Sequence, residues 1–232
     1  MPNIMTRRQL VAALTAGTVL TTSKTATAQA AGFLRWMGRW NEQVERFLFG
    51  ADRLADELPA SATTPAEKFP SYFIAEDMPM APAGWVLKVG GLVARPSTFS
   101  LEQLQRMARM DMRVRHHCVE GWSAVASWHG VRLRDVADAV GADPRASYVE
   151  FRSFDAGYWS SWDRDSALHK QTMLAYGMNG APLYPDHGAP LRLYSAVKLG
   201  YKMVKYLTEV NFLPTRTGGY WEDKGYEWFG GV

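Results

Sequence analysis

Hydrophobic and polar residues alternate along several short stretches of the chain between residues 85 and 212, which is the pattern of β-strands with one buried face. The alternation is clearest over 204–212, where one face carries Val204, Tyr206, Thr208, Val210 and Phe212. Short apolar stretches bounded by glycine or polar residues predict further strands at 85–89, 112–117, 148–152 and 191–194.

Two short helices are predicted between these strands. Ser100 and Gln103 have the spacing of a capping box, which predicts a helix over 101–110. A second helix is predicted over 133–140, because Gly141 provides the residue that most often ends a helix.

A β-hairpin is predicted over 174–183, since Asn179-Gly180 is a strongly preferred dipeptide for a two-residue hairpin turn. Strands dominate the pattern, the helices are short, and strands do not alternate with long helices. We therefore expect an α+β fold with mixed β-sheets and short helices, formed by residues 70–232.

The residues before position 70 follow other patterns. Apolar residues at steps of three and four over 33–49 predict an amphipathic helix, which most often covers a core and less often binds a partner. Residues 50–69 are rich in Ala, Pro, Ser and Thr and predict a connecting arm. The helix and the arm together occupy 31–69.

Residues 1–30 have the tripartite pattern of an export signal. The pair Arg7-Arg8 precedes an apolar run over 10–20, and small residues at 26–30 provide cleavage sites. The apolar run is too short and too polar to span a bilayer as a stable helix. We therefore expect export to the periplasm by the twin-arginine route, which carries folded proteins.

Size and composition narrow the possible functions. The chain has 232 residues, 47% of them hydrophobic, which is enough for one substantial core. Its formal net charge is only +3 and its basic residues are dispersed, so a nucleic-acid partner is not expected. The nine tryptophans fit either an aromatic pocket or ordinary core packing.

Cys118 is the only cysteine, and it follows His116-His117 and precedes Glu120. It cannot form an internal disulfide. A lone cysteine is often a small buried hydrophobe, but a free thiol in an exported protein is exposed to oxidation. The residues leave three interpretations open: a core residue, a thiolate that binds a soft metal, and a nucleophile activated by an imidazole.

Four cationic residues lie near glycines between positions 187 and 205. They are His187, Arg192, Lys202 and Lys205. Cationic donors on loops and strand ends can hold the phosphate of a cofactor, and they can equally form a solvated face.

Three longer motifs give a more specific indication. Residues 174–183 read Leu-Ala-Tyr-x-Met-Asn-Gly-x-Pro-Leu, and residues 187–192 read His-Gly-x-Pro-Leu-Arg. Residues 118–123 read Cys-Val-Glu-x-Trp-Ser. Over residues 70–227 the chain resembles the sulfite oxidase family of molybdopterin-dependent oxidoreductases, and within it the bacterial branch typified by the catalytic subunit of periplasmic methionine sulfoxide reductase.

The resemblance implies a sulfite-oxidase-type molybdopterin-binding fold and a molybdenum–molybdopterin cofactor (Mo-MPT). It implies that Cys118 is the thiolate ligand of molybdenum and that Glu120 and Tyr226 are active-site residues. Cofactor contacts are implied for Phe73, Ile74, Ser153, Asp155, His187, Arg192, Met203, Val204 and Lys205.

The chain departs from the sulfite oxidases where they hold their anionic substrate. Ala75, Glu76 and Asp77 replace their Arg-Asn-His, and Ser123 replaces an arginine after the cysteine. A sulfite site would have to recruit other arginines, for which the candidates are Arg113, Arg115 and Arg164. A pocket lined by tryptophans favours a neutral substrate instead. The candidates for that lining are Trp122, Trp128, Trp159 and Trp162.

We therefore predict a periplasmic oxidoreductase that performs two-electron oxo transfer on a sulfoxide or a related small substrate. A redox partner protein, such as a membrane haem protein or a cytochrome, would exchange electrons with it. The chain stops shortly after Tyr226, without the family's C-terminal dimerisation domain, so we expect a monomer. The alternatives are a sulfite dehydrogenase that passes electrons to a cytochrome, a cofactor-binding protein without turnover, and a cysteine hydrolase.

Overall fold

A computed structural model of the chain describes residues 37, 40–45, 50, 52–155 and 157–232. Its contacts divide the chain into two units, Met1–Asn41 and Glu42–Val232. The predicted export signal and most of the predicted helix over 33–49 lie outside the described residues, and within that helix residues 37 and 40–45 are helical. No helix among the described residues is long and apolar enough to cross a membrane.

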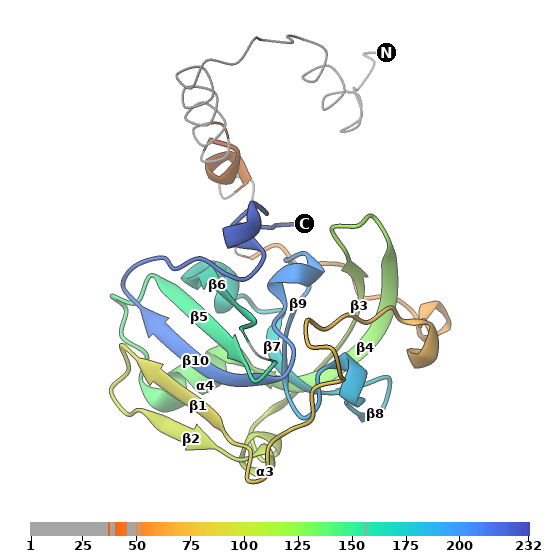
Figure 1. Cartoon of the computed structure of the whole chain (residues 1–232), viewed down its shortest axis with the longest axis horizontal. Helices are drawn as coiled ribbons and strands as arrows, with labels where there is room; N and C mark the ends of the chain where they lie inside the picture. Colours follow the sequence, from red (N-terminus) through yellow and green to blue (C-terminus); the bar gives the residue numbers. More distant parts are fainter. Residues whose placement is uncertain (1–36, 38–39, 46–49, 51, 156) are drawn as a thin grey trace. The chain divides into compact units, whose positions relative to one another are not determined.

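The first of two sheets in the second unit is mixed (Figure 1). Its order is β2-β1-β10-β5-β6, and its strands are β2 (Ser97–Phe99), β1 (Leu87–Gly91), β10 (Leu207–Leu213), β5 (Tyr148–Ser153) and β6 (Trp159–Asp163). The central pair β1 and β10 is parallel, and the other neighbours are antiparallel. The predicted mixed sheet is therefore confirmed.

The second sheet is antiparallel throughout. It consists of β3 (Arg109–His117), β4 (Ser123–Arg132), β7 (Thr172–Met178), β8 (Ala181–Pro182) and β9 (Arg192–Ser195), which pairs with β7. The predicted hairpin is confirmed, since β7 and β8 join through Asn179 at φ 52° and Gly180 at φ 82°. Positive φ at both residues is what a type I′ turn requires.

Short helices connect these strands. The α-helices of the second unit are α3 (Leu101–Gln105), α4 (Leu133–Val140) and α5 (Arg164–Ala167). The 3₁₀-helices are η1 (Ala60–Ala62), η2 (Ala66–Lys68), η3 (Pro185–His187), η4 (Gly200–Lys202) and η5 (Glu222–Lys224). The helix over 133–140 and its left-handed Gly141 cap are confirmed, as is the capping box at Ser100.

Several predicted boundaries are wrong. The strand predicted over 112–117 begins at Arg109. The helix after Ser100 ends at Gln105 rather than at 110, because residues 109 and 110 already pair with β4. The strand predicted over 85–89 is displaced to Leu87–Gly91. The strand predicted over 204–212 begins at Leu207, because Tyr206 has a positive φ of 56° that interrupts the extended backbone. Strands β2, β4 and β6 were not predicted.

Both sheets contribute to one hydrophobic core. It includes Leu87, Phe151 and Val210 from the first sheet and Val114, Leu174, Met178 and Leu193 from the second. β7 is buried along its whole length, because it pairs with β4, β8 and β9 and packs in the core.

The arm that precedes β1, defined here as residues 52–69, is bound to the second sheet. The backbone amide of Leu58 donates to the carbonyl of Arg113, and that of Thr64 donates to the carbonyl of Val125. Asn179 Nδ2, in the β7–β8 turn, donates to the carbonyl of Thr64. The arm ends at Phe69, which is buried in the core, so the chain after it is held at the mouth of the site described next.

Candidate functional site

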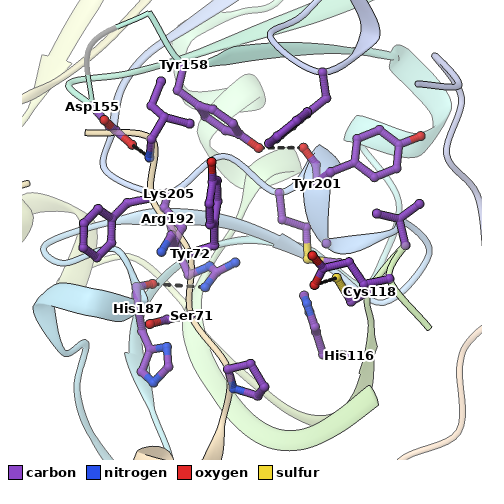
Figure 2. A pocket seen from close by; sticks show the side chains of 18 of the residues that line it. Ser71, Tyr72, His116, Cys118, Asp155, Tyr158, His187, Arg192, Tyr201 and Lys205 are labelled. Carbon is purple, nitrogen blue, oxygen red and sulfur yellow. Dashed lines mark hydrogen bonds between the residues drawn. The ribbon is translucent and has the colours of Figure 1, made fainter. Parts of the chain in front are cut away.

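A cavity of about 320 Å³ lies in the second unit and is lined by four separate parts of the chain (Figure 2). They are the end of the arm and the residues after it (69–74), the β3–β4 turn (118–122), the region from His187 to Tyr206, and the C-terminal residues Trp221 and Tyr226. Single residues of β3 and of the loop after β5 complete the wall, namely His116, Asp155 and Tyr158. Segments far apart in the sequence therefore form one site.

Cys118 is brought to the cavity by the tight turn between β3 and β4. Its backbone amide donates to the carbonyl of Trp122, and the amide of Gly121 donates to the carbonyl of Cys118. Gly121 has a φ of 92°, a conformation that other residues rarely adopt, so the glycine permits the turn. The cysteine side chain is half-buried and faces the cavity.

Glu120 is the polar neighbour of this thiol. The distance from Cys118 Sγ to Glu120 Oε2 is 3.7 Å, and Trp122 Nε1 donates to the same oxygen at 2.9 Å. Burial raises the pKa of the Cys118 thiol, and the negative charge of Glu120 adds to that rise. In the protein alone the thiol therefore keeps its proton, and a bound cation is what would stabilise the thiolate.

The two histidines before Cys118 lie differently. Because side chains alternate along β3, His116 enters the cavity wall whereas His117 does not line it. Burial lowers the pKa of His116 to about 3, so its imidazole is neutral at physiological pH. Among the described residues Cys118 Sγ has a hydrogen bond with Glu120 and none with an imidazole nitrogen. The cysteine–histidine hydrolase hypothesis therefore lacks the geometry that it needs.

Two cations, the buried Arg192 and the partly buried Lys205, lie in another part of the cavity wall (Figure 2). An Arg192 Nη donates to the carbonyl of His187 at 3.0 Å, and its guanidinium lies 4.9 Å from the centre of the Trp128 ring. Lys205 Nζ donates to the carbonyl of Asp186 at 2.7 Å. Burial lowers the pKa of Arg192 to about 10, and burial together with the Arg192 charge lowers the pKa of Lys205 to about 7.

These cations fit an anionic ligand. Among the described residues neither Arg192 nor Lys205 has a carboxylate within ion-pair distance, and the buried Tyr206 hydroxyl next to them has no hydrogen-bond partner. Buried cations are costly without a counter-charge. A phosphate group would provide both the missing charge and the acceptor oxygens.

His187 is fixed beside these cations by the arm. The residue is buried, and its Nε2 donates to the carbonyl of Ala66 at 3.2 Å. The bond sets the orientation of the ring and leaves Nδ1 as the acceptor nitrogen of the neutral imidazole. Its carbonyl meanwhile orients Arg192. His187 thus links the arm to the cationic part of the cavity.

Asp155 lines the cavity, and its carboxylate forms hydrogen bonds with backbone amides. It accepts hydrogen bonds from the amides of Ile74 at 3.0 Å and Ala75 at 3.2 Å. Ser153 in turn accepts from the amide of Asp155. Asp155 therefore holds the segment that carries Tyr72 and Phe73 against the cavity.

Most residues predicted to contact the cofactor are brought to the cavity, and two are not. Those that line it are Phe73, Ile74, Asp155, His187, Arg192, Met203 and Lys205, together with Cys118, Glu120 and Tyr226. Ser153 lies behind Asp155 and does not line it. Val204 is buried, and its carbonyl accepts from the amide of Leu193, so its side chain packs in the core.

Aromatic side chains form the outer wall. The Tyr226 ring lies 5.0 Å from that of Trp221 and 5.3 Å from that of Tyr201, and the Trp221 ring lies 6.1 Å from that of Tyr72. Of the four tryptophans predicted to line a pocket, only Trp122 does so. The other three are Trp128 and Trp162, which are core residues, and Trp159, which lies elsewhere on β6.

Sequence reasoning missed His116 as a wall residue, and it missed Tyr158 and Tyr201. The Tyr158 hydroxyl donates to the carbonyl of Tyr201 at 2.8 Å, which joins the loop after β5 to η4. The period-two pattern of β3 could have placed His116 on the same face as the buried Val114. No local pattern marks Tyr158, because its position depends on the pairing of distant strands.

The arginines considered as substitutes in an anionic substrate site do not line the cavity. Arg164 donates to the carbonyls of Asp143 and Ala146, and Arg115 donates to Ser123. Arg113 is also absent from the wall. None of these three candidates is therefore placed where it could contact a substrate in this cavity.

Comparison with known proteins agrees with this geometry. The family model described as "Oxidoreductase molybdopterin binding domain" matches residues 75–221. The chain is 39% identical over 196 residues to a putative protein-methionine-sulfoxide reductase subunit, YedZ1, of Azospira oryzae, which covers 84% of this chain and 74% of that protein.

It is also 35% identical over 154 residues to the protein-methionine-sulfoxide reductase catalytic subunit MsrP of Xanthomonas axonopodis pv. citri. That match covers 60% of this chain and 48% of MsrP, so the chain spans about half of that relative. Among solved structures, the sulfane dehydrogenase SoxCD of Paracoccus pantotrophus superposes with a TM-score of 0.54 at 23% identity. The superposition covers 56% of this chain and 38% of that chain, and it shows a shared fold.

Proposed function

Because the chain belongs to the oxidoreductase molybdopterin-binding domain family, to which the sulfite oxidases also belong, we propose that its cavity holds a molybdenum–molybdopterin cofactor with Cys118 as a ligand of the metal. The chain is an oxidoreductase of this family. When bound, the cofactor supplies two-electron oxo-transfer chemistry. The protein binds it, orients it and controls what reaches it.

One observation carries this proposal. A single cavity contains the only thiol of the chain and, in another part of its wall, the buried Arg192 and the partly buried Lys205, which lack a carboxylate partner among the described residues. A thiolate suits a soft metal, and the cations suit a phosphate. A cofactor that carries both a metal and a phosphate meets both requirements at once.

The residues of the chain have separate tasks in this arrangement. Arg192, Lys205 and His187 hold the anionic end of the cofactor. Glu120 accepts from Trp122 Nε1 and lies beside the Cys118 sulfur, so its carboxylate would be the proton acceptor or donor near a metal held by that sulfur. Tyr226 lines the cavity and is partly exposed to solvent, so we assign its hydroxyl the task of orienting a substrate oxygen.

The substrate that this wall suits best is a neutral sulfoxide. Near Cys118 the cavity is lined by His116, Glu120 and Trp122, and by Tyr226 at its mouth. His116 is neutral, and Glu120 would repel a sulfite dianion. Two of the relatives are named protein-methionine-sulfoxide reductase subunits, which supports the same substrate class.

The test is a comparison of substrates on purified holoenzyme. Molybdenum and pterin are first measured per chain, and turnover is then measured with dimethyl sulfoxide, with methionine sulfoxide and with sulfite, using artificial electron mediators. We expect a higher kcat/KM with the sulfoxides. Efficient sulfite oxidation would contradict the substrate assignment, and absence of molybdenum from active enzyme would contradict the whole proposal.

Two further parts of the proposal concern the cell. The Arg7-Arg8 pair and the apolar run after it support export to the periplasm by the twin-arginine route. Reduction of a sulfoxide needs two electrons for every turnover, and we propose that a separate redox protein, such as a membrane haem protein or a cytochrome, supplies them.

A further inference from the structure

The loop that carries Trp221 and Tyr226 to the cavity is fixed by a residue that points away from it. Glu222 begins η5, between the two aromatic residues. Its side chain is 4% exposed, whereas Tyr226 is 38% exposed at the cavity mouth. The loop, defined here as residues 219–226, therefore presents aromatic rings to the cavity and a carboxylate to the protein interior.

The carboxylate of Glu222 is bound by two residues of the main body of the domain. Lys202 Nζ donates to Oε1 in a buried ion pair, and Ser160 Oγ donates to the same oxygen at 2.5 Å. Lys202 also donates to the carbonyl of Ser161 at 3.0 Å. The lysine side chain is fully buried, so the pair joins the loop to both η4 and β6 out of contact with water.

The same lysine lies next to a wall residue. Lys202 directly follows Tyr201, whose ring packs on Tyr226 at 5.3 Å and whose hydroxyl donates to the carbonyl of Glu227 at 2.5 Å. A displacement of Glu222 would therefore move Trp221 and Tyr226 relative to a fixed Tyr201. Neither Lys202 nor Glu222 lines the cavity.

The carboxylate of Glu222 packs directly against the backbone of Gly219. A Cβ at this position would overlap Glu222 Oε2, although the backbone of Gly219 has no positive φ that would itself demand glycine. The carboxylate folds back over the first residue of its own loop. A methyl group at 219 would therefore push the carboxylate out of place while leaving both members of the ion pair in the chain.

We infer that Glu222 and Lys202 are positioning residues for substrate, which act through Tyr226 and Trp221 at the cavity mouth. The inference rests on the proposed function, since it concerns the same site. Breaking a buried ion pair leaves one charge uncompensated, and the loop then leaves the position in which its rings close the cavity wall. The consequence is looser binding of substrate, because a displaced positioning group weakens binding even when the reacting centre is intact.

The experiment uses holoenzyme with dimethyl sulfoxide as substrate and kinetics expressed per bound molybdenum. We expect Glu222→Ala and Gly219→Ala each to raise KM about tenfold with a smaller change in kcat. Glu222→Gln should keep KM within about twofold, because its amide oxygen still accepts from Lys202, although its Tm falls with the lost counter-charge. Hydrogen exchange in peptides that cover 219–226 should quicken in the two alanine variants.

A matched control separates positioning from general stability. Asp163, the last residue of β6, and Lys198, between β9 and η4, form a second buried ion pair, 3.6 Å apart, and neither lines the cavity. Asp163→Asn should lower Tm while KM and exchange over 219–226 stay at wild-type values. If this control raised KM as much as Glu222→Ala, the effect would be one of stability and the inference would be overturned.

The decisive arm is a double-mutant cycle with Tyr226→Ala. If Glu222 acts through the aromatic residues at the cavity mouth, Glu222→Ala should raise KM less than about twofold in the Tyr226→Ala background. Additive effects, or an unchanged KM in both Glu222→Ala and Gly219→Ala, would overturn the inference. If Glu222→Ala does not fold, Gly219→Ala in the same cycle decides. A wild-type enzyme without sulfoxide turnover would instead refute the proposed function.

Discussion

Lys205 and Arg192 lie in the same part of the cavity wall, and each donates to a backbone carbonyl. Burial lowers the pKa of Lys205, and the Arg192 charge adds to that fall. Burial is the larger cause and brings the Lys205 pKa to about 7. The closeness of two positive charges lowers the free energy of unfolding of the cofactor-free protein. The arrangement becomes favourable only when an anion binds between them.

The first prediction concerns this anchor. Arg192→Ala and Lys205→Ala should each remove a charge-assisted hydrogen bond to the phosphate, a loss of ~1.5–3 kcal/mol. Molybdenum per chain should fall, while turnover per bound molybdenum changes less. The control is Lys88→Ala, an exposed lysine on β1 that does not line the cavity. Unchanged occupancy in both cavity variants would refute the assignment.

The second prediction concerns pH and the cofactor-free protein. The folded-state pKa of Lys205, about 7, lies below the ordinary value of 10.5, so between these values the unfolded chain binds more protons than the folded chain. Lys205 therefore makes stability rise with pH from about 7 to about 10.5. Lys205→Met should flatten this rise in chemical unfolding curves measured across the window.

Inorganic phosphate provides the counterpart of that experiment. An anion beside Lys205 favours the charged lysine and raises its pKa, so phosphate should reduce the difference in pH dependence between wild type and Lys205→Met. Sodium chloride at equal ionic strength is the control for screening. An identical response to the two salts would show that the cations form no phosphate site.

The third prediction concerns the segment after the arm. Asp155→Ala should release the amides of Ile74 and Ala75 and so loosen the residues that carry Tyr72 and Phe73. Hydrogen bonds to a charged acceptor contribute ~1.5–3 kcal/mol, so we expect the free energy of unfolding to fall by about that amount. The Tm should fall with it, and hydrogen exchange over 70–77 should become faster. Asp111→Ala, which removes only an exposed ion pair with Arg109, should leave both measurements unchanged.

The fourth prediction concerns export. Changing both Arg7 and Arg8 to lysine preserves charge but removes the twin-arginine pair. Folded precursor should then accumulate in the cytoplasm, as measured by fractionation and immunoblot. Normal appearance of the double variant in the periplasm would refute the proposed route.

Local sequence signals predicted the elements whose boundaries are set locally. The Asn179-Gly180 turn, the Ser100 capping box and the Gly141 cap depend on the conformations that single residues adopt, and all three were found. Strand β4 was missed because it is buried on nearly all sides, so its residues do not alternate. The end of the helix after Ser100 was missed because pairing of residues 109 and 110 with β4 is a long-range effect.

In the candidate site, too, the residues in local motifs were predicted and the long-range contacts were not. Cys118, Glu120, His187 and Arg192 belong to motifs and were predicted from the resemblance. The roles of Glu222 and Lys202 depend on where a C-terminal loop meets a buried 3₁₀-helix, which no local pattern specifies. Arg113, Arg115 and Arg164 were considered as substrate ligands because their charges were known and their positions were not.

The central claim, that Cys118 is a ligand of molybdenum in this cavity, is tested most directly by X-ray absorption at the molybdenum edge, on wild type and on Cys118→Ser holoenzyme. Serine replaces a soft thiolate with a hard, weakly acidic hydroxyl, so activity should be lost while the phosphate anchor still retains the cofactor. The account predicts one sulfur neighbour fewer around molybdenum in the variant. An unchanged sulfur shell, or wild-type turnover by Cys118→Ser, would contradict it.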